Sequence, residues 1–517
     1  MKKIDPIELE ILWNRLIAIV DEAAAALVRT SFSTVVRESN DFACALLDED
    51  GYCLAQSTLS VAGFIGTAPL SLRKFLEIIP KEQLRPGDVL FSNDPWIGTG
   101  HLPDSTMAAP IFHGSRIVAF VVTVAHLSDI GGRQWSADAN EVFEEGILIP
   151  VTRLYNKGKL NTTVLDILKA NVRLPDQVLG DIDAQIVAIQ VATRRLRELM
   201  DEAKLGDLRT VSNAIFDVSA RALGKGIREL KPGTYIGEVE ADGWDTPVRI
   251  RAAVTVKNGK IAVDYAGSSP QSRYGINESY NHTFAYTVYP FKCMLSPTLP
   301  NNEGFLRLFE VNAPEGLIVN SRRPAAVGAR QLVGHLLQGA IFKAMENVVP
   351  ERVQADSGTP LWTLVFRGID PERARAFSTI LFFNGGTGAM MNQHGSPCTS
   401  FPGNISNTSI EVVESLSPLL YRKKAIAIDS GGRGKWNGGA GQVVHIESRW
   451  DATTRVSLIT ERTRIPAQGL HGGQPGKVGF VHKNGTAVQD TKGIVELQRG
   501  DVLEIGLPGG GGFGDAR

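Results

Sequence analysis

The sequence predicts an α+β protein of several domains, because strand hairpins, long helices and a glycine-rich region follow one another along the chain. Hairpins are expected in residues 41–57 and 106–126, and long helices within residues 176–230 and at 327–348. A chain of 517 residues can bury several hydrophobic cores. We expect an α+β domain with a helical segment, a central α+β domain and a glycine-rich β region, at residues 1–230, 231–425 and 426–517.

The first helix is expected to begin directly after Asp5. Asp5 is a favourable N-cap, Pro6 suits the first helical position and Glu8 completes the capping pattern. Apolar residues then recur at helical spacing, and alanines continue the pattern to about Arg29. These apolar residues are Ile7, Ile11, Leu12, Leu16 and Ile19.

Residues 176–230 carry a second helical pattern, which is interrupted at Gly206 and at residues 224–226. Its apolar stripe consists of Ile182, Ile186, Ile189, Leu196 and Leu199. Further along, Asn258-Gly259 is a hairpin turn signal between two apolar runs. The helix expected at residues 327–348 contains glycines that suggest close packing, so we interpret its His335 as structural rather than catalytic.

The hairpin at residues 106–126 constrains function more than any other feature. Residues 117–125 are an apolar, β-branched run typical of a buried strand, and residues 108–112 form a weaker strand. The intervening residues 113–115 contain glycine and fit a three-residue turn. The open end of this hairpin therefore lies where its first strand begins and its second strand ends.

Three polar side chains are expected to meet at that open end. With a regular register from the turn onward, His126 lies opposite Leu102, between His101 and Asp104. Two imidazoles and a carboxylate oxygen are a ligand set for a divalent metal. A structural interpretation is also open, with Asp104 as a helix N-cap and His126 as a core histidine bonded to the backbone.

The hairpin at residues 41–57 supplies a fourth candidate ligand, Asp41, at its mouth. Residues 42–47 are strand-like, residues 48–51 are a strong turn signal, and the chain then returns. Taken alone, a residue such as Asp41 is more often a solvated residue at the start of a strand. Asp94, after Asn93, is similarly either a turn residue or a residue that lines a site.

Composition excludes several classes of protein. A formal net charge of −1 provides no field to attract nucleic acid or anionic membranes. No apolar run approaches the roughly 20 residues of a membrane span, and the N-terminus leads into a charged helix rather than a signal peptide. The four cysteines contain no Cys-x-x-Cys pair. Cys44 and Cys53 could face each other across a hairpin, but we expect reduced thiols and a cytoplasmic protein.

The last third of the chain is dense in glycine. The glycine-rich stretches lie at residues 385–388, 431–434, 438–439, 472–473 and 509–512. We expect turns in a β-rich domain, with phosphate-binding loops as the alternative. The chain has no G-x-x-x-x-G-K-[ST] motif and no G-x-G-x-x-G that opens a helix after a strand, so nothing in it predicts nucleotide binding.

The chain resembles the hydantoinase B/5-oxoprolinase B family over nearly its whole length, and that family is related to the large subunits of acetone carboxylases. Each shared segment is short, but their number and order carry the resemblance. The segments are residues 5–11, 37–43, 93–95, 101–104, 125–126, 144–147, 302–304, 407–411, 429–432, 461–462, 469–473 and 508–515.

The resemblance implies one half of a two-component enzyme. A hydantoinase A-type partner with an actin-like ATPase fold would bind ATP and phosphorylate the substrate oxygen, and the B-type subunit would complete the reaction at a divalent metal. The metal ligands of the family fall on Asp41, His101, Asp104 and His126 of this chain. Zinc, manganese and iron all suit this set. Glu38, Asp94 and Asp129 are candidates for orienting water or supporting the ligands.

The function that the resemblance implies is ATP-dependent opening of a small cyclic amide, such as hydantoin, N-methylhydantoin, 5-oxoproline or a lactam. The alternatives are a subunit of an ATP-dependent ketone carboxylase and a non-catalytic scaffold. Because the match begins at residue 5, we expect a standalone B-type subunit in a hetero-oligomer with the A-type ATPase. Residues 281–282 and 393–394 are polar positions that either line a pocket or form surface turns.

Overall fold

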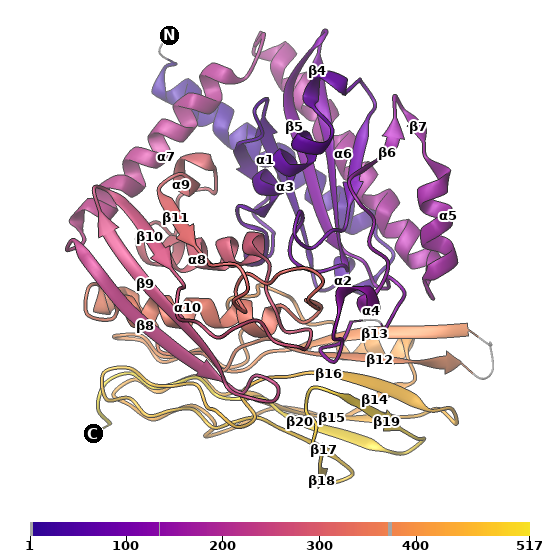
Figure 1. Ribbon diagram of the computed structural model, residues 1–517, viewed down its shortest axis with the longest axis vertical. Helices are drawn as coiled ribbons and strands as arrows, with labels where there is room; N and C mark the ends of the chain where they lie inside the picture. The colour runs from indigo at the N-terminus through magenta and orange to yellow at the C-terminus, as the bar shows by residue number, and fades with distance from the viewer. Residues whose placement is uncertain (1–3, 134, 371–374, 517) are drawn as a thin grey trace.

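The computed structural model describes residues 4–133, 135–370 and 375–516, which form three regions packed against one another (Figure 1). The N-terminal α/β region lies at the upper right of the view, the central region at the left, and the C-terminal strands form layers at the bottom. This mixture of helices and sheets confirms the predicted α+β class. None of the helices in these ranges is both long enough and apolar enough to cross a membrane.

A seven-stranded sheet is the scaffold of the N-terminal region, in the order β2-β1-β5-β4-β3-β6-β7. Helices α1 and α6 pack on one face and α3 on the other, so β5, an inner strand of the sheet, is buried on both faces. This explains the continuous apolar sequence of β5. The strands are β1 (Phe42–Asp48), β2 (Cys53–Gln56), β3 (Val89–Ser92), β4 (Asp104–His113), β5 (Arg116–His126), β6 (Thr152–Asn156) and β7 (Lys159–Leu160). The helices are α1 (Pro6–Thr30), α2 (Thr34–Arg37), α3 (Thr67–Ile78), α4 (Val142–Glu145), α5 (Thr162–Asn171) and α6 (Pro175–Glu202), with short 3-10 turns at Ala62–Phe64 and Lys81–Gln83.

Helix α1 begins as predicted, but part of its expected apolar stripe is wrong. Asp5 Oδ1 accepts hydrogen bonds from the backbone N–H groups of Ile7 and Glu8, at 2.9 and 3.3 Å. Ile7 and Ile11 are 70% and 55% exposed. At about 100° per residue they lie on the side of the helix opposite the buried stripe. The residues that pack against α6 and the sheet include Leu9, Leu12, Leu16, Ile19, Ala23 and Leu27.

The β4–β5 hairpin forms where it was predicted, but its register was predicted incorrectly. The turn contains only residues 114–115, and its glycine takes the left-handed conformation that a two-residue hairpin turn requires. A β-bulge after Ile111 shifts the pairing again. As a result, Asp104 rather than Leu102 lies opposite His126.

The second predicted hairpin, β1–β2, is also present. Cys53 pairs with Leu47 in this hairpin rather than facing Cys44. Both cysteines are buried in different apolar clusters, and all four cysteines of the chain are free thiols. On its other edge β1 pairs with β5 along its whole length, which places Asp41 next to the end of β5.

The helical segment predicted at residues 176–230 is divided once rather than twice. Gly206 lies between α6 and α7 (Arg209–Glu229), as predicted. Gly224 and Gly226 lie inside α7, so the interruption expected at residues 224–226 is wrong. Packing against the neighbouring α1 and α9 outweighs the low intrinsic helix propensity of glycine there.

The central region pairs a four-stranded sheet, β11-β10-β9-β8, with helices α8 and α10. The Asn258-Gly259 turn is confirmed, and both residues have positive φ, at 53° and 73°. Helix α10 begins at Gln331, later than predicted, because the backbone N–H groups of Val327 and Gly328 bond Glu145 instead of forming helix. The elements are β8 (Gly233–Ala241), β9 (Val248–Lys257), β10 (Lys260–Asp264), β11 (Phe309–Asn312), α8 (Tyr280–Leu295), α9 (Glu303–Leu306) and α10 (Gln331–Met345), with a 3-10 turn at Pro350–Arg352.

Two sheets pack face to face in the C-terminal region, in the orders β13-β12-β16-β19 and β14-β15-β20-β17-β18. The expected boundary at residues 425/426 falls inside β14, which pairs with β15. The elements are β12 (Trp362–Asp370), β13 (Arg375–Phe383), α11 (Ile410–Leu416), β14 (Leu419–Ile426), β15 (Gln442–Ser448), β16 (Thr454–Ile459), β17 (Phe480–Lys483), β18 (Thr486–Ala487), β19 (Ile494–Leu497) and β20 (Val502–Gly506).

The turn that we expected is present at residues 470–473, where Gly473 N–H bonds Leu470 C=O at 2.9 Å, but most of the glycine-rich stretches are not turns. They run side by side and bond one another through the backbone, as in Gly510 N–H to Gly439 C=O at 3.0 Å. A Cβ on Gly510 would lie 2.0 Å from the carbonyl oxygen of Thr387. Glycine is therefore required because whole backbones approach one another. The N–H groups that would hold a phosphate are used between segments, as in Gly511 N–H to Asp356 C=O at 2.8 Å.

Candidate metal centre

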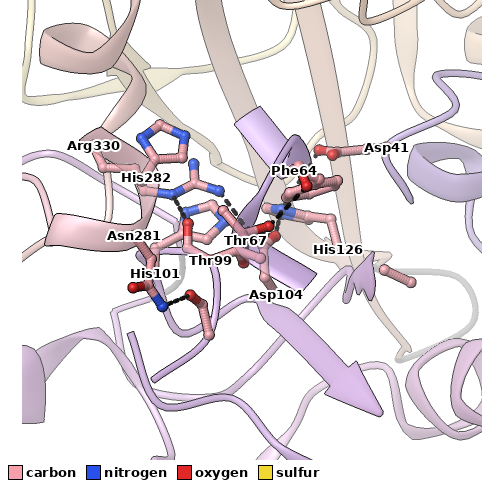
Figure 2. Close-up of polar contacts among 12 residues, drawn as sticks. Asp41, Phe64, Thr67, Thr99, His101, Asp104, His126, Asn281, His282 and Arg330 are labelled. Atoms are coloured by element: carbon pink, nitrogen blue, oxygen red, sulfur yellow. Dashed lines mark hydrogen bonds and ion pairs between the residues drawn. The ribbon is translucent and has the colours of Figure 1, made fainter. Parts of the chain in front are cut away.

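The polar residues at the open end of the β4–β5 hairpin lie in the interior of the protein (Figure 2). His101, Asp104 and His126 each offer one ligand atom, and these atoms lie within 4.8 Å of one another. All three side chains are almost fully buried. The structure thus brings together the three residues that the hairpin pattern placed close to one another.

His101 is held at both ring nitrogens. Its Nδ1 lies 3.0 Å from the carbonyl oxygen of Gly328, and its Nε2 lies 2.8 Å from Asp104 Oδ1. A carbonyl oxygen can only accept, so Nδ1 carries a proton and donates it. In a neutral imidazole, Nε2 then presents a lone pair to Asp104.

His126, the last residue of β5, has no hydrogen-bond partner for either ring nitrogen among the described residues. Its Nδ1 lies 3.3 Å from Asp104 Oδ1 and 3.7 Å from Asp41 Oδ2. The ring packs against Trp135, with centroids 4.5 Å apart. An unpartnered buried polar group is costly, so the position of this imidazole is that of a side chain placed to bond a ligand.

Asp104 carries its charge in the interior because a cation neutralises it from the side away from the histidines. Arg330 Nη2 lies 2.6 Å from Asp104 Oδ2, and Arg330 Nε donates to the carbonyl oxygen of Thr99 at 2.8 Å. The Thr99 hydroxyl also donates to Oδ2. Burial raises the pKa of Asp104, but His101 and Arg330 outweigh burial and hold that pKa well below its ordinary value.

The donor atoms at this centre fit a cation. Burial, together with Arg330, lowers the pKa of His101 to about 4, so neither His101 nor Asp104 holds a proton between them at neutral pH. Two lone pairs then face each other at 2.8 Å, which is unfavourable unless a positive charge lies between them. Ligands at roughly 2.0–2.2 Å from one metal ion are separated by roughly 3.0–3.5 Å, close to the spacings found here.

Asp41 is adjacent to this group but is not one of its three members. Its backbone carbonyl accepts a hydrogen bond from His126 N–H at 3.1 Å, which ties it to the end of β5. Burial raises the pKa of the Asp41 carboxyl to about 6, against the opposing effect of His126. The carboxylate therefore lies within reach of a cation bound by His126.

The other three candidate carboxylates are bound elsewhere. Glu38 forms an ion pair with Arg37 at 3.1 Å. Asp94 caps a turn and pairs with Arg323, and Asp129 accepts hydrogen bonds from the loop after it and pairs with Arg173. None of the three lines the cavity beside the cluster, so a role for them in orienting water stays a prediction.

A cavity of about 30 Å³ adjoins the cluster. The cavity is lined by Asp41 and His101 and by side chains from the central and C-terminal regions. Among the latter are His282, His335 and Phe382. A much larger groove of about 650 Å³ lies between α2, α11 and β13, and its lining includes none of the four candidate ligands. The small cavity is therefore the one that chemistry at the cluster would use.

Sequence reasoning missed several of the residues that build this site. Arg330, Trp135 and Gly328 were not singled out, although a lone arginine at the start of an apolar helix was a usable signal for Arg330. Of the two polar positions left open, His282 lines the cavity whereas His394 is an exposed residue beside Trp436. Asn281 holds the carbonyl groups of Ile97 and Gly98, and so fixes the loop that precedes His101.

The chain matches a family model described as Hydantoinase B/oxoprolinase over residues 5–516. The B-type subunit of a putative D-/L-hydantoinase from Pseudomonas sp. (strain NS671) is 30% identical, over 100% of this chain and 91% of that protein. The crystal structure of the ATP-dependent caprolactamase from Pseudomonas jessenii is similar, with a TM-score of 0.91 and 26% identity over 99% of this chain and 91% of that chain. An acetone carboxylase structure shares the fold, with a TM-score of 0.88 and 19% identity over 99% of this chain and 76% of that chain. Since the family model spans nearly the whole sequence, the chain belongs to the Hydantoinase B/oxoprolinase family.

Proposed function

We propose that this protein is the ring-opening subunit of an ATP-dependent cyclic amide hydrolase, with a divalent metal at the buried histidine–aspartate cluster. The observation that carries the proposal is the unpartnered, buried His126 beside His101 and Asp104, in a chain of this family. The names of the similar proteins, a hydantoinase subunit and a caprolactamase, support a cyclic amide as the substrate class.

His101 Nε2, His126, one oxygen of Asp104 and the carboxylate of Asp41 would hold the metal. Such a set suits zinc, manganese or iron. A bound divalent ion of this kind lowers the pKa of water from 15.7 toward roughly 7 and so supplies hydroxide at neutral pH.

The surrounding residues orient these side chains. The carbonyl oxygen of Gly328 accepts hydrogen bonds from His101 Nδ1 at 3.0 Å and from Trp135 Nε1 at 2.7 Å. This arrangement fixes the ring of His101 with Nε2 toward Asp104. Arg330 donates a hydrogen bond to Oδ2 of Asp104, so that Oδ1 is the oxygen that faces both histidines. The burial of all these groups keeps bulk water away from the centre.

ATP is proposed to be consumed by an A-type actin-like ATPase partner, in a hetero-oligomer with this chain. An amide resists hydrolysis because its nitrogen donates electrons to the carbonyl carbon. Phosphorylation of the carbonyl oxygen removes that protection before hydroxide attacks. The division of labour is consistent with glycine-rich stretches whose backbone N–H groups are used within the protein.

The complex of this chain with its A-type partner provides the test. Hydantoin, N-methylhydantoin, 5-oxoproline and caprolactam are each supplied with ATP, and ring-opened product and phosphate are measured. We expect product from at least one of them only when ATP and both subunits are present. Ring opening by the partner alone would overturn the proposal.

A ketone carboxylase subunit is the second candidate, favoured by the acetone carboxylase fold. Labelled bicarbonate separates the two, because a carboxylase incorporates the label into product and an amide hydrolase does not. A non-catalytic scaffold is the third candidate and predicts no tightly bound metal in the purified chain.

A further inference from the structure

A second buried pair of ionisable side chains lies beside the cluster, at the start of α8. Glu278 Oε2 lies 2.6 Å from His282 Nδ1, and the two side chains are 0% and 2% exposed. Glu278 lies two residues before the first residue of α8, and His282 lies in the first turn of that helix. Neither residue is required by the chemistry proposed above.

His282 presents its other ring nitrogen to the cavity beside the metal centre. The residue lines the same cavity as Asp41 and His101. Its Nε2 has no hydrogen-bond partner within the described ranges, because Glu278 is the only residue bonded to this ring. Figure 2 shows its ring next to the guanidinium of Arg330, on the side of the site that α8 supplies.

Two glycines make room for this pair. A Cβ on Gly63 would lie 2.9 Å from His282 Nε2. A Cβ on Gly334 of α10 would lie 2.4 Å from Glu278 Oε1 and 2.8 Å from His282 Cε1. Gly334, one of the glycines predicted to allow close packing of its helix, therefore admits a polar pair rather than an apolar contact.

The pair holds two protons, one on the carboxyl of Glu278 and one on the ring nitrogen of His282 that faces the cavity. Burial raises the pKa of Glu278 well above its ordinary value and lowers the pKa of His282 well below its own, with Arg330 adding to the second effect. A neutral carboxyl donates to Nδ1, so the neutral imidazole carries its own proton on Nε2. His282 thus presents its Nε2–H group to the cavity, and the Glu278 carboxyl can supply a proton to the other nitrogen of the same ring.

The proposed reaction needs such a proton. Hydroxide adds to the activated carbon of an O-phosphorylated amide as a hydroxyl group, and this group loses its proton to solvent. The adduct then carries an oxyanion, a phosphoryl oxygen and the ring nitrogen on one carbon. Loss of phosphate regenerates the cyclic amide and wastes the ATP, whereas loss of nitrogen opens the ring. Phosphate is the better leaving group, since an amide anion is far more basic, so ring opening requires a proton on nitrogen.

We infer that His282 donates that proton and that Glu278 replaces it, an inference that rests on the function proposed above. The oxyanion forms the carbonyl double bond, the carbon–nitrogen bond breaks, and its electron pair takes the proton from His282 Nε2. At the same time Nδ1 takes the proton from Glu278 Oε2. The products are an amine, an acyl phosphate and the Glu278 carboxylate, which regains its proton from solvent. A second water then hydrolyses the acyl phosphate to a carboxylate and free phosphate. His282 is then a catalytic residue and Glu278 a positioning residue.

The test is the ratio of phosphate released to ring-opened product, measured on the complex with its partner, ATP and hydantoin, 5-oxoproline or caprolactam. We expect a ratio near one for the natural protein and a rise of at least tenfold for His282→Gln, which still fills the space but cannot relay a proton. Glu278→Gln should also raise the ratio, because its amide can hold the ring but cannot replace the proton. Metal content should stay unchanged in both variants.

The matched control is His394→Gln, which alters an exposed histidine and should leave the ratio at one. An unchanged ratio in His282→Gln, with phosphate and product falling together, would overturn the inference and leave the proposed function intact. Loss of metal from His282→Gln would also overturn it, since His282 would then be a ligand. Absence of ATP-dependent ring opening in the natural complex would instead remove the proposed function and this inference together.

Discussion

Asp104 and His126 face each other directly across β4 and β5, at the open end of the hairpin. Opposite residues in an antiparallel pair point to the same face of the sheet, so the backbone ladder itself sets the approach of these side chains. The N–H group of His126 continues the ladder to the carbonyl of Asp41, at 3.1 Å. The adjacent ends of β1, β4 and β5 thus position three of the four candidate ligands, namely Asp41, Asp104 and His126.

Replacing His126 with alanine should remove the metal that we propose at the cluster. The imidazole has no hydrogen bond to protein among the described residues, so its loss removes the proposed ligand without breaking a hydrogen bond. Metal measured by elemental analysis should fall roughly tenfold or more. His113→Ala, at the other end of the same hairpin and partly exposed, is the matched control and should keep its metal. Equal metal in both variants would contradict the assignment.

Replacing Arg330 with methionine should destabilise the fold, because Asp104 Oδ2 loses its buried partner. The expected loss in free energy of unfolding is about 3–5 kcal/mol, measured by urea denaturation with chelator present. Removing the charge as well, in Arg330→Met with Asp104→Asn, should recover part of the loss. Arg322→Met alters an exposed arginine and should change stability little. A small effect of Arg330→Met would show that Asp104 is not ionised in the fold.

Glu145 should make stability fall as pH rises. Burial raises its pKa to about 8, against the backbone N–H groups of Gly328 and Val327, whereas the unfolded chain has the ordinary value of 4.5. Between these two values the folded state binds a proton that the unfolded state does not, so folding loses about 1.4 kcal/mol per pH unit. The stabilisation is complete below pH 4.5 and has been lost above pH 8.

Urea unfolding at several pH values between 5 and 8 measures this slope for Glu145. The variant Glu145→Gln should remove that part of the pH dependence, because an amide does not titrate. The exposed Glu141→Gln should keep the natural slope. Identical slopes in the natural protein and Glu145→Gln would mean that Glu145 is already ionised in the fold.

Alanine at Gly510 should prevent normal folding of the glycine-rich core. Its Cβ would lie 2.0 Å from the backbone oxygen of Thr387, and a backbone in a bonded layer cannot move aside easily. We expect a large drop in melting temperature or loss of soluble protein. Gly206→Ala has open space around its Cβ and should be neutral or stabilising by roughly 0.4–1 kcal/mol. Similar behaviour of both variants would refute the packing argument.

Local patterns predicted the elements well where one segment determines its own structure. The N-cap at Asp5, the turn at Asn258-Gly259 and both N-terminal hairpins depend on neighbouring residues, and all are present. Patterns failed where a partner elsewhere decides the outcome. Ile11 has the right spacing for a helix stripe, but the side of α1 that meets α6 excludes it from the core.

The sequence by itself indicated the candidate ligands and predicted that one hairpin brings His101, Asp104 and His126 close. Only the tertiary structure decided the bulge that aligns Asp104 with His126, and it alone brought Arg330, 226 residues further along, to the same carboxylate. The physical reason is that spacing along a chain specifies neighbours within one element. Contacts between distant segments depend instead on how three cores pack against one another.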